Sequence, residues 1–417
     1  MLRLPFSWNS LVNPPAVLFA DMTRLMTLVA GEPSGDLLAA ELIRGIQHYP
    51  DLEQSQFFGI GGPRMAECGF QSSWPMGTLS VRGYVEVLSH LLPILKIRSA
   101  LIEKIARDRP DIYIGIDAPD FNLAIEKKCR KMGIPTVHYI SPSIWAWRGQ
   151  RIHGIKKAVD HMLCIFPFEP KIYHDVGIQA TYIGHPLANQ IPIQPQPKDA
   201  KERLLNMHLL QYGPLRANET VIAVLPGSRS SEMRYIAPGF FQAMVIMHQR
   251  HGKKIRFLVP VATLALRSSL ELLKQNAQRQ CEEIQIELIT EQSSLILEAA
   301  DSVLIASGTA TLEAALWKKP MVISYSVPWL TAQIMKRQGY LPYVGLPNIL
   351  CQSFVVPELL QEEAVPERLA IKTLEWLDKP KQVADLVDIF QELHLVLRQP
   401  TGVLTAQAIA QTLTQNH

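Results

Sequence analysis

Three charged side chains follow directly after apolar runs, at the places where parallel strands of α/β proteins would end. Glu32 follows LMTLVA in the turn GEPSGD, Asp117 follows IYIGI in the turn DAPDFN, and Arg229 follows VIAVLP in the turn GSR. An acid held at a strand end can serve as a general base. An arginine can bind a phosphate through two parallel hydrogen bonds. These residue types therefore predict proton removal and anion binding.

The two acidic turns differ in what else could explain them. In the turn at 31–36, small glycines allow close approach of a ligand, and Ser34 is the expected N-cap of the next helix. A capped helix start without a ligand explains this hexapeptide equally well. Asp120 is well placed to cap the helix expected near 121–132, whereas Asp117 lies too early for that role. Asp117 is therefore our candidate general base.

Two turns in the second half of the chain have the composition of anion sites. Each follows an apolar run and opens a helix, so that backbone N–H groups and the helix dipole favour a negative charge. An acid one turn into the second helix is placed to accept hydrogen bonds from ribose hydroxyls. A plain turn or a capped core helix is the alternative for each turn alone. The residues are Gly227, Ser228, Arg229, Ser307, Gly308, Thr309 and Glu313.

Composition excludes several classes of function. The 417 residues have a net charge of +3, which gives no sign of a nucleic-acid-binding face. The five cysteines are scattered and the twelve histidines have no metal-ligand spacing, so a zinc site is not expected. There is no Asp-x-Asp triplet for a magnesium-bound diphosphate and no Walker lysine motif. We expect no metal and no cofactor.

The order of apolar runs predicts two Rossmann-like, doubly wound α/β domains that face each other across a cleft. Strand-like runs alternate with helical segments, which is typical of parallel sheets. A stretch with four prolines at 186–199 interrupts the series. The predicted parts are an N-terminal extension at 1–21, a first domain at 22–190, a linker at 191–218, a second domain at 219–375 and C-terminal helices at 376–417. The last helices either pack on the first domain or join a second copy in a homodimer.

The segment 77–109 has an apolar half followed by a basic half. Such a segment suits the surface of an anionic membrane, and a pair of core helices with a solvated basic side is the alternative. The expected apolar contacts are Val85, Leu88, Leu91, Leu92 and Leu95, and the basic residues are Lys96, Arg98, Lys104, Arg107 and Arg109. Trp145 and Trp147 either line the cleft or fill the core. No apolar run of about 20 residues predicts a membrane span.

Ten motifs in order make the sequence resemble the lipid-A-disaccharide synthase family. They are VAGEPSGD (29–36), GIGGPRM (59–65), RGYVEVL (82–88), GIDAPDFN (115–122), HYISPSIWAWR (138–148), FPFE (166–169), YIGHP (182–186), LPGSR (225–229), ASGTATLE (306–313) and GLPNIL (345–350). Each motif alone is weak, but their common order is highly specific. The extension and the linker fall outside the resemblance.

The resemblance implies an inverting glycosyltransferase of the GT-B type that uses no metal. The implied substrates are UDP-2,3-diacylglucosamine and 2,3-diacylglucosamine 1-phosphate (lipid X), and the products are a β-1,6-linked disaccharide 1-phosphate and UDP. By the family pattern, Asp117 matches the catalytic base, and the turn at 307–313 matches the UDP-binding region. Glu32, Arg229, Asn348 and Gln361 match residues needed for activity. A cytoplasmic enzyme attached peripherally to the inner face of the inner membrane is implied.

Two other functions remain open from the sequence. A UDP-N-acetylglucosamine 2-epimerase would share the anion-binding turns of the second domain, but would not need the apolar segment at 77–109. A two-lobed nucleotide-sugar binding protein without catalysis would normally be exported, and residues 1–21 make a poor signal peptide.

Overall fold

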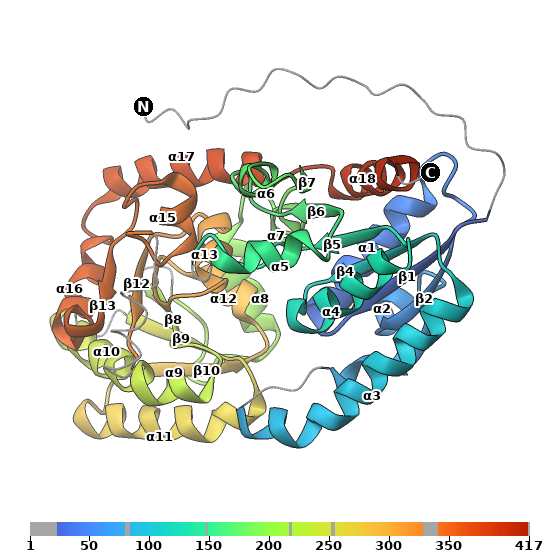
Figure 1. Ribbon diagram of the computed structural model, residues 1–417. Helices are drawn as coiled ribbons and strands as arrows, with labels where there is room; N and C mark the ends of the chain where they lie inside the picture. Colours follow the sequence, from blue (N-terminus) through green and yellow to red (C-terminus); the bar gives the residue numbers. More distant parts are fainter. Residues whose placement is uncertain are drawn as a thin grey trace. The chain divides into compact units, whose positions relative to one another are not determined.

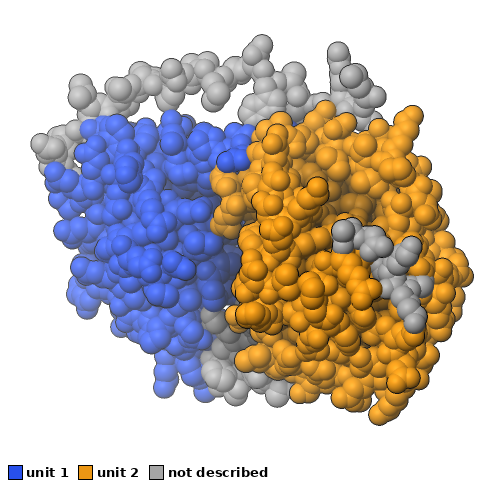
Figure 2. All heavy atoms as spheres, turned by 180° about the vertical axis from the view of Figure 1, so that it is seen from behind, with its two compact units in different colours: residues 1–186, 396–417 blue, residues 187–395 orange. Residues whose placement is uncertain are grey.

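The computed structural model describes residues 23–79, 84–146, 149–216, 219–251, 255–327 and 341–415, with the backbone alone at 84–91. It divides the chain into two compact units, coloured blue and orange in Figure 2. The first consists of residues 1–186 and 396–417, and the second of residues 187–395. Helix α8 (Pro197–Asn206) lies within the segment predicted as a linker.

The first unit is built on a seven-stranded parallel sheet with the strand order β3-β2-β1-β4-β5-β6-β7 (Figure 1). The paired strands run parallel throughout, as apolar runs buried on both faces predict. The strands are β1 (Leu25–Ala30), β2 (Gln56–Gly61), β3 (Gln71–Pro75), β4 (Ile112–Ile116), β5 (Thr136–Tyr139), β6 (His161–Cys164) and β7 (Gln179–Tyr182).

Helices cover both faces of this sheet. On one face, Met26, Leu28 and Ala30 of β1 pack in a core with α1 and α18. On the other face, Val29 and Tyr113 pack with α3 and α4. The helices are α1 (Pro33–Gln47), α2 (Pro63–Ala66), η1 (Met76–Thr78), α3 (Tyr84–Asp108), α4 (Pro119–Lys131), η2 (Gly149–Arg151), α5 (Ile152–Lys156), α6 (Glu169–His174) and α18 (Thr401–Gln415).

The last helix of the described chain belongs to this first unit. Helix α18 lies beside α1 (Figure 1). The two backbones approach so closely that a β-carbon on Gly45 would be 2.5 Å from the carbonyl oxygen of Gly402. Of the two arrangements expected for the C-terminal helices, packing on the first unit is therefore the one that α18 adopts.

The second unit has a six-stranded parallel sheet with the order β10-β9-β8-β11-β12-β13. A large core cluster joins its strands to α10, α11 and α16. The strands are β8 (Thr220–Leu225), β9 (Ile255–Val261), β10 (Gln285–Thr290), β11 (Ser302–Ala306), β12 (Met321–Tyr325) and β13 (Glu358–Leu360). The further helices are α7 (Pro186–Gln190), α9 (Ser230–Tyr235), α10 (Ala237–His251), α11 (Leu264–Gln280), α12 (Ser293–Ala299), α13 (Ala310–Leu316), α15 (Leu346–Cys351), η3 (Gln361–Glu363), α16 (Pro366–Glu375) and α17 (Pro380–Leu397).

In both sheets the strand order reverses direction at one point. In the first sheet, β2 and β3 lie on one side of the central pair β1 and β4, and β5 to β7 lie on the other side. In the second sheet, β9 and β10 lie on one side of the pair β8 and β11, and β12 and β13 lie on the other side. Ligands of doubly wound proteins bind beyond the carboxyl ends of the strands at such a switch point. Glu32, Asp117, Arg229 and Ser307 each lie shortly after one of these four strands. The topology therefore puts these candidate residues at the switch points of the two sheets.

The prediction of two doubly wound parallel α/β domains is confirmed. That the two domains face each other across a cleft stays a prediction. Three strands were not predicted, namely β2, β3 and β13. Strand β2 contains two glycines, β3 is the polar edge strand QSSWP, and β13 has only three residues. None of them shows the continuous apolar run of a strand that is buried on both faces.

Candidate active site

The turns that carry Glu32 and Asp117 are neighbours at the switch point of the first sheet. Ala30 at the end of β1 is paired with Ile116 at the end of β4, so the next residues of the two strands emerge side by side. A β-carbon on Gly31 would lie 3.2 Å from the β-carbon of Ala118, which shows how closely the turns pack. Both acidic side chains are half-buried. They form one acidic edge above the two central strands.

The backbone of Asp117 is held in an uncommon conformation. Asp117 and Ala118 have φ angles of +52° and +42°, in the left-handed region that costs a non-glycine residue roughly 1–2 kcal/mol. The Asp117 N–H donates to the carbonyl of Tyr139 at 2.9 Å, and its carbonyl accepts from Asn122 at 2.8 Å. Among the described residues, its carboxylate has no hydrogen-bond partner. The side chain is therefore free to bind a substrate group.

Two helix caps predicted from the sequence are wrong. Helix α1 begins at Pro33 with Glu32 as the N-cap, so Ser34 lies inside the first turn. Helix α4 begins at Pro119 with Ala118 as the N-cap, and the exposed Asp120 pairs with Arg151 at 2.6 Å instead. In both cases, the proline starts the helix earlier than a side-chain cap would, because its fixed φ suits the first helical position.

Asp36 of the motif GEPSGD is a structural residue. Its carboxylate is buried and accepts hydrogen bonds from the backbone N–H groups of Gly62, Arg64 and Met65 at 2.9–3.1 Å. It thus caps α2 and joins two motifs that are 26 residues apart in sequence. Glu32, the other acid of that motif, is the N-cap residue of α1 at the end of β1.

A buried carboxylate fixes an aromatic cluster beyond β5 and β6. Glu169 accepts from the indole N–H of Trp145 at 2.9 Å and from the N–H groups of Ile165 and Phe166 at 3.1 and 3.0 Å. Burial raises the pKa of Glu169 to about 7, against the opposing effect of these donors. Trp145 packs edge-on against Phe168, with ring centroids 5.3 Å apart. Trp145 is half-buried, and Trp147 lies outside the described residues.

In the second unit, an internal carboxylate occupies the turn after β8. Glu232 accepts from the N–H groups of Ser228 and Arg229 at 2.6 and 3.0 Å. Gly227 makes room for it, with φ of +119°. The side chain of Arg229 is 77 % exposed, with Nη1 3.8 Å from Glu232 Oε1. The exposed guanidinium is the group of this turn that could meet an anion, because the amides of Ser228 and Arg229 already have an acceptor.

The turn after β11 is more open. Ser307 donates from its hydroxyl to the carbonyl of Val344 at 2.9 Å, which ties the turn to the segment before α15. Apart from the adjoining residues of the turn, no heavy atom of the described residues lies within 4 Å of the position that a β-carbon on Gly308 would take. Thr309 is the N-cap of α13. Burial raises the pKa of the half-buried Glu313, while a hydrogen bond from Ser294 opposes that shift.

Asn348 and Gln361 both bind the backbone of their own unit. Asn348 is fully buried, and its amide nitrogen donates to the Val356 carbonyl at 2.9 Å and to Glu358 at 2.8 Å. In the amide orientation that satisfies both of its ends, Gln361 donates to the Val327 carbonyl at 3.1 Å and accepts from the Val327 N–H at 3.3 Å. Both side chains therefore hold parts of the segment that runs from β12 to β13.

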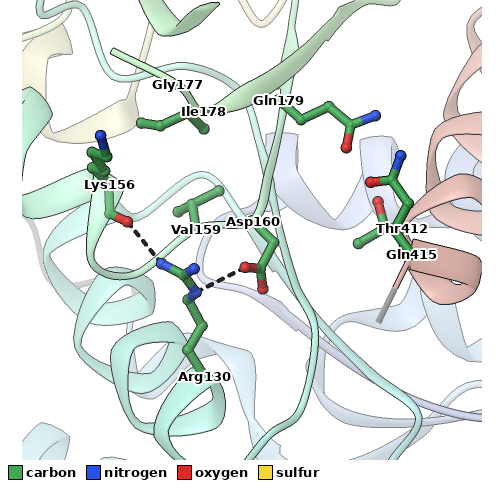
Figure 3. Close-up of a pocket in the computed structure, with 9 residues that line it drawn as sticks. All are labelled: Arg130, Lys156, Val159, Asp160, Gly177, Ile178, Gln179, Thr412 and Gln415. Atoms are coloured by element: carbon green, nitrogen blue, oxygen red, sulfur yellow. Dashed lines mark hydrogen bonds and ion pairs between the residues drawn. The ribbon is translucent and has the colours of Figure 1, made fainter. Parts of the chain in front are cut away.

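Two surface features lie apart from these strand ends. A pocket of about 320 Å³ opens at the amino ends of β6 and β7, where Arg130 points toward Asp160 and the Lys156 carbonyl (Figure 3). Since this pocket lies at the opposite edge of the sheet, it is not the predicted site.

On α3, Leu92 is 70 % exposed and Leu95 is half-buried. The side chains of Val85, Leu88 and Leu91 lie outside the described residues.

The fold and the placement of polar turns at the two switch points define a protein of the GT-B class. Solved structures support the fold. UDP-GlcNAc 2-epimerase from Neisseria meningitidis bound to UDP-GlcNAc has a TM-score of 0.58 at 13 % identity, covering 94 % of this chain and 99 % of its own. HepE of Anabaena in complex with UDP and glucose has a TM-score of 0.55 at 13 % identity, covering 94 % and 100 %.

The chain belongs to the lipid-A-disaccharide synthetase family, whose family model matches residues 26–411. The lipid-A-disaccharide synthases of Burkholderia thailandensis and Burkholderia mallei are each 52 % identical over 388 residues, which is 93 % of this chain and 96 % of theirs. The predicted family is thereby confirmed, and with it an enzyme of lipid A disaccharide synthesis. The epimerases share the fold at far lower identity, so that alternative is not favoured.

Sequence reasoning missed the residues that hold the site together. Asn122 donates to the Asp117 carbonyl, and Glu232 accepts from the amides of Ser228 and Arg229. Glu358 accepts from the amides of Val344 and Gly345. A signal was available for Asn122 and Glu232, since a polar residue three to five positions after a strand-end turn is well placed to bind that turn. Glu358 binds a segment 13 to 14 residues before it and has no such local signal.

Proposed function

We propose that this chain transfers the diacylglucosamine unit of UDP-2,3-diacylglucosamine to the 6-hydroxyl of 2,3-diacylglucosamine 1-phosphate. The products are a β-1,6-linked disaccharide 1-phosphate and UDP, in the synthesis of lipid A. The observation that carries this proposal is the position of the family motifs. GEPSGD and GIDAPDFN follow β1 and β4, and LPGSR and ASGTATLE end or follow β8 and β11, so all four lie at the switch points.

Asp117 is the general base of the proposed reaction. Its carboxylate removes the proton from the acceptor hydroxyl as that oxygen bonds to the anomeric carbon of the donor. The bond between that carbon and the UDP oxygen breaks with inversion, and UDP takes up the electron pair. Proton transfer of this kind contributes about 10²- to 10⁴-fold to a rate. Glu32, at the neighbouring strand end, orients the acceptor.

The second unit binds UDP and stabilises its developing charge. The exposed guanidinium of Arg229 pairs with the diphosphate, and Gly308 and Thr309 supply N–H groups and a hydroxyl. Ser307 holds this turn in place, because its N–H and hydroxyl already donate to the carbonyls of Ser324 and Val344. Glu313 accepts from the ribose, while Gly227 and Ser228 shape the turn that presents Arg229. Asn348 and Gln361 act by holding the surrounding loops, as their backbone contacts indicate.

Helix α3 is the proposed membrane contact, because both substrates carry acyl chains. Leu92 is a large apolar residue with 70 % of its surface exposed, and Pro93 follows it within the helix. Lys96 is exposed nearby, whereas Lys104 and Arg107 pair with Asp108 and contribute less free charge. Among the described residues, no helix is long and apolar enough to cross a membrane. We propose a peripheral attachment through the exposed side chain of Leu92.

The membrane proposal is tested by vesicle sedimentation. Leu92→Glu should release the protein from vesicles that contain anionic lipid. Leu264→Glu is the matched control, since Leu264 on α11 is 71 % exposed and should leave binding unchanged. Equal retention of both variants would reject α3 as the contact.

The reaction itself is tested by counting UDP released from UDP-2,3-diacylglucosamine with and without the acceptor. Release that depends on the acceptor, together with formation of the disaccharide 1-phosphate, is expected. Conversion of UDP-N-acetylglucosamine to its 2-epimer would favour the epimerase alternative. Binding of UDP without turnover of either substrate would favour a binding protein.

A further inference from the structure

A buried pair of side chains lies beneath the turn that carries Asp117. Tyr113 on β4 and Asn122 on α4 are both fully buried. The Tyr113 hydroxyl donates to Asn122 Oδ1 at 2.8 Å, and Asn122 Nδ2 donates to the Asp117 carbonyl at 2.8 Å. Two hydrogen bonds in series thus lead from the interior of the sheet to the backbone of the proposed base.

The Tyr113 hydroxyl supports one orientation of the Asn122 amide. Nδ2 also lies 3.3 Å from the Ile116 carbonyl oxygen and 3.4 Å from that of Val29. All three backbone partners are acceptors, so only the NH₂ end of the amide can face them. Without the hydroxyl, Oδ1 would be a buried acceptor with no donor, which is costly and favours a shift of the side chain.

The same amide bridges the two strands at the switch point. Val29 lies in β1, just before the turn with Glu32, and Asp117 follows β4. The left-handed backbone at Asp117 and Ala118 persists only if its surroundings impose it. Asn122 supplies that constraint on the carbonyl side, as the backbone of Tyr139 does on the N–H side.

We propose that Tyr113 and Asn122 are positioning residues for the transfer reaction. They hold the turn in the one conformation that directs the Asp117 carboxylate at the acceptor hydroxyl. The inference rests on the base role proposed above for Asp117. A displacement of about 1 Å in a reacting group can lower a rate about 100-fold. Loss of the pair should therefore lower kcat, while UDP, which is bound by the second unit, should bind as before.

The test is Tyr113→Phe in the full chain, with kcat, both KM values and UDP affinity measured. We expect kcat to fall roughly 10- to 100-fold, with KM and the UDP dissociation constant within about twofold of wild type. Tyr173→Phe is the matched control. Its hydroxyl is equally buried in the first unit but pairs with the Ser141 hydroxyl at 2.7 Å and not with the Asp117 turn, so kcat should not change.

A second arm separates positioning from general destabilisation. In the Asp117→Asn background, Tyr113→Phe should lower the residual kcat less than about twofold, because it acts through a base that is already absent. The inference would be overturned if the kcat losses of the two single variants multiplied in the double variant. A wild-type kcat in Tyr113→Phe alone, or a loss of UDP affinity in that variant, would also overturn it. Wild-type turnover of Asp117→Asn alone would instead reject the base role itself.

Discussion

The carboxylate of Glu232 lies where a β-carbon on Gly227 would stand, since such an atom would be 2.2 Å from Glu232 Oε2. Gly227 also has φ of +119°, which side chains disfavour. The Glu232 carboxylate in turn accepts hydrogen bonds from the amides of Ser228 and Arg229. Glycine and glutamate together therefore make the turn that presents Arg229.

Gly227→Ala should disrupt this turn. Strain and displacement of Glu232 should destabilise the protein by about 1–3 kcal/mol and weaken UDP binding. Thermal unfolding and calorimetric titration with UDP measure the two effects. Gly239→Ala in α10 is the control, because the nearest atom to its β-carbon would be 4.0 Å away. Unaltered UDP affinity in Gly227→Ala would separate the turn from nucleotide binding.

Arg229→Ala should weaken UDP binding without unfolding the protein. Hydrogen bonds to a charged group contribute about 1.5–3 kcal/mol, which corresponds to a loss of about 10- to 100-fold in affinity. The side chain is 77 % exposed, so stability should change by less than about 0.5 kcal/mol. Arg234→Ala, also exposed on α9, should bind UDP normally. Wild-type affinity in Arg229→Ala would remove this arginine from the site.

The sequence allowed the central strands and their turns to be predicted because those strands are buried on both faces. Their continuous apolar runs and the polar residues after them are local signals. Edge strands such as β3 and β13 lack that signal, since only one side of them is paired. The fold class and the functional edges could thus be derived, while the full number of strands could not.

The packing of the candidate site could not be derived in the same way. Asn348 matches a residue needed for activity, yet it is fully buried and binds Val356 and Glu358. Nothing in the sequence distinguishes an asparagine that touches a ligand from one that holds a loop. The carboxylate of Glu232 within the expected anion turn is a similar case, because its position depends on the fold of the following helix.

Chelation should leave the reaction unchanged. The proposed charge stabilisation comes from Arg229 and from the N–H groups of Gly308 and Thr309, so the proposed reaction has no step that needs a metal ion. UDP release should be the same with excess EDTA and should not rise when magnesium is added. Activity that is lost on chelation and returns with magnesium would show that the diphosphate is bound in another way.

Glu169 should make the stability of the protein depend on pH. Its pKa is raised from 4.5 to about 7 by burial, so the folded state binds a proton more tightly than the unfolded state. The stabilising contribution is complete below about pH 4.5 and is lost as the pH rises toward 7. Glu169→Gln should remove this part of the dependence of stability on pH. Unfolding midpoints of the variant and the wild type, measured between about pH 4.5 and 7, test this.

Glu67→Gln is the control for that experiment. The Glu67 side chain is 57 % exposed and pairs with Arg64 at 3.6 Å on the surface. It should leave the pH dependence as in wild type. An identical slope in Glu169→Gln and wild type would show that the buried carboxylate does not titrate in this range.

The base role of Asp117 is tested most directly by the turnover and UDP affinity of Asp117→Asn, compared with Asp120→Asn. Asp120 is three residues away with a side chain that is 90 % exposed, so its variant should remain active. For Asp117→Asn we expect kcat to fall by about 10²- to 10⁴-fold with an unchanged dissociation constant for UDP. Turnover of Asp117→Asn within twofold of wild type would contradict the account.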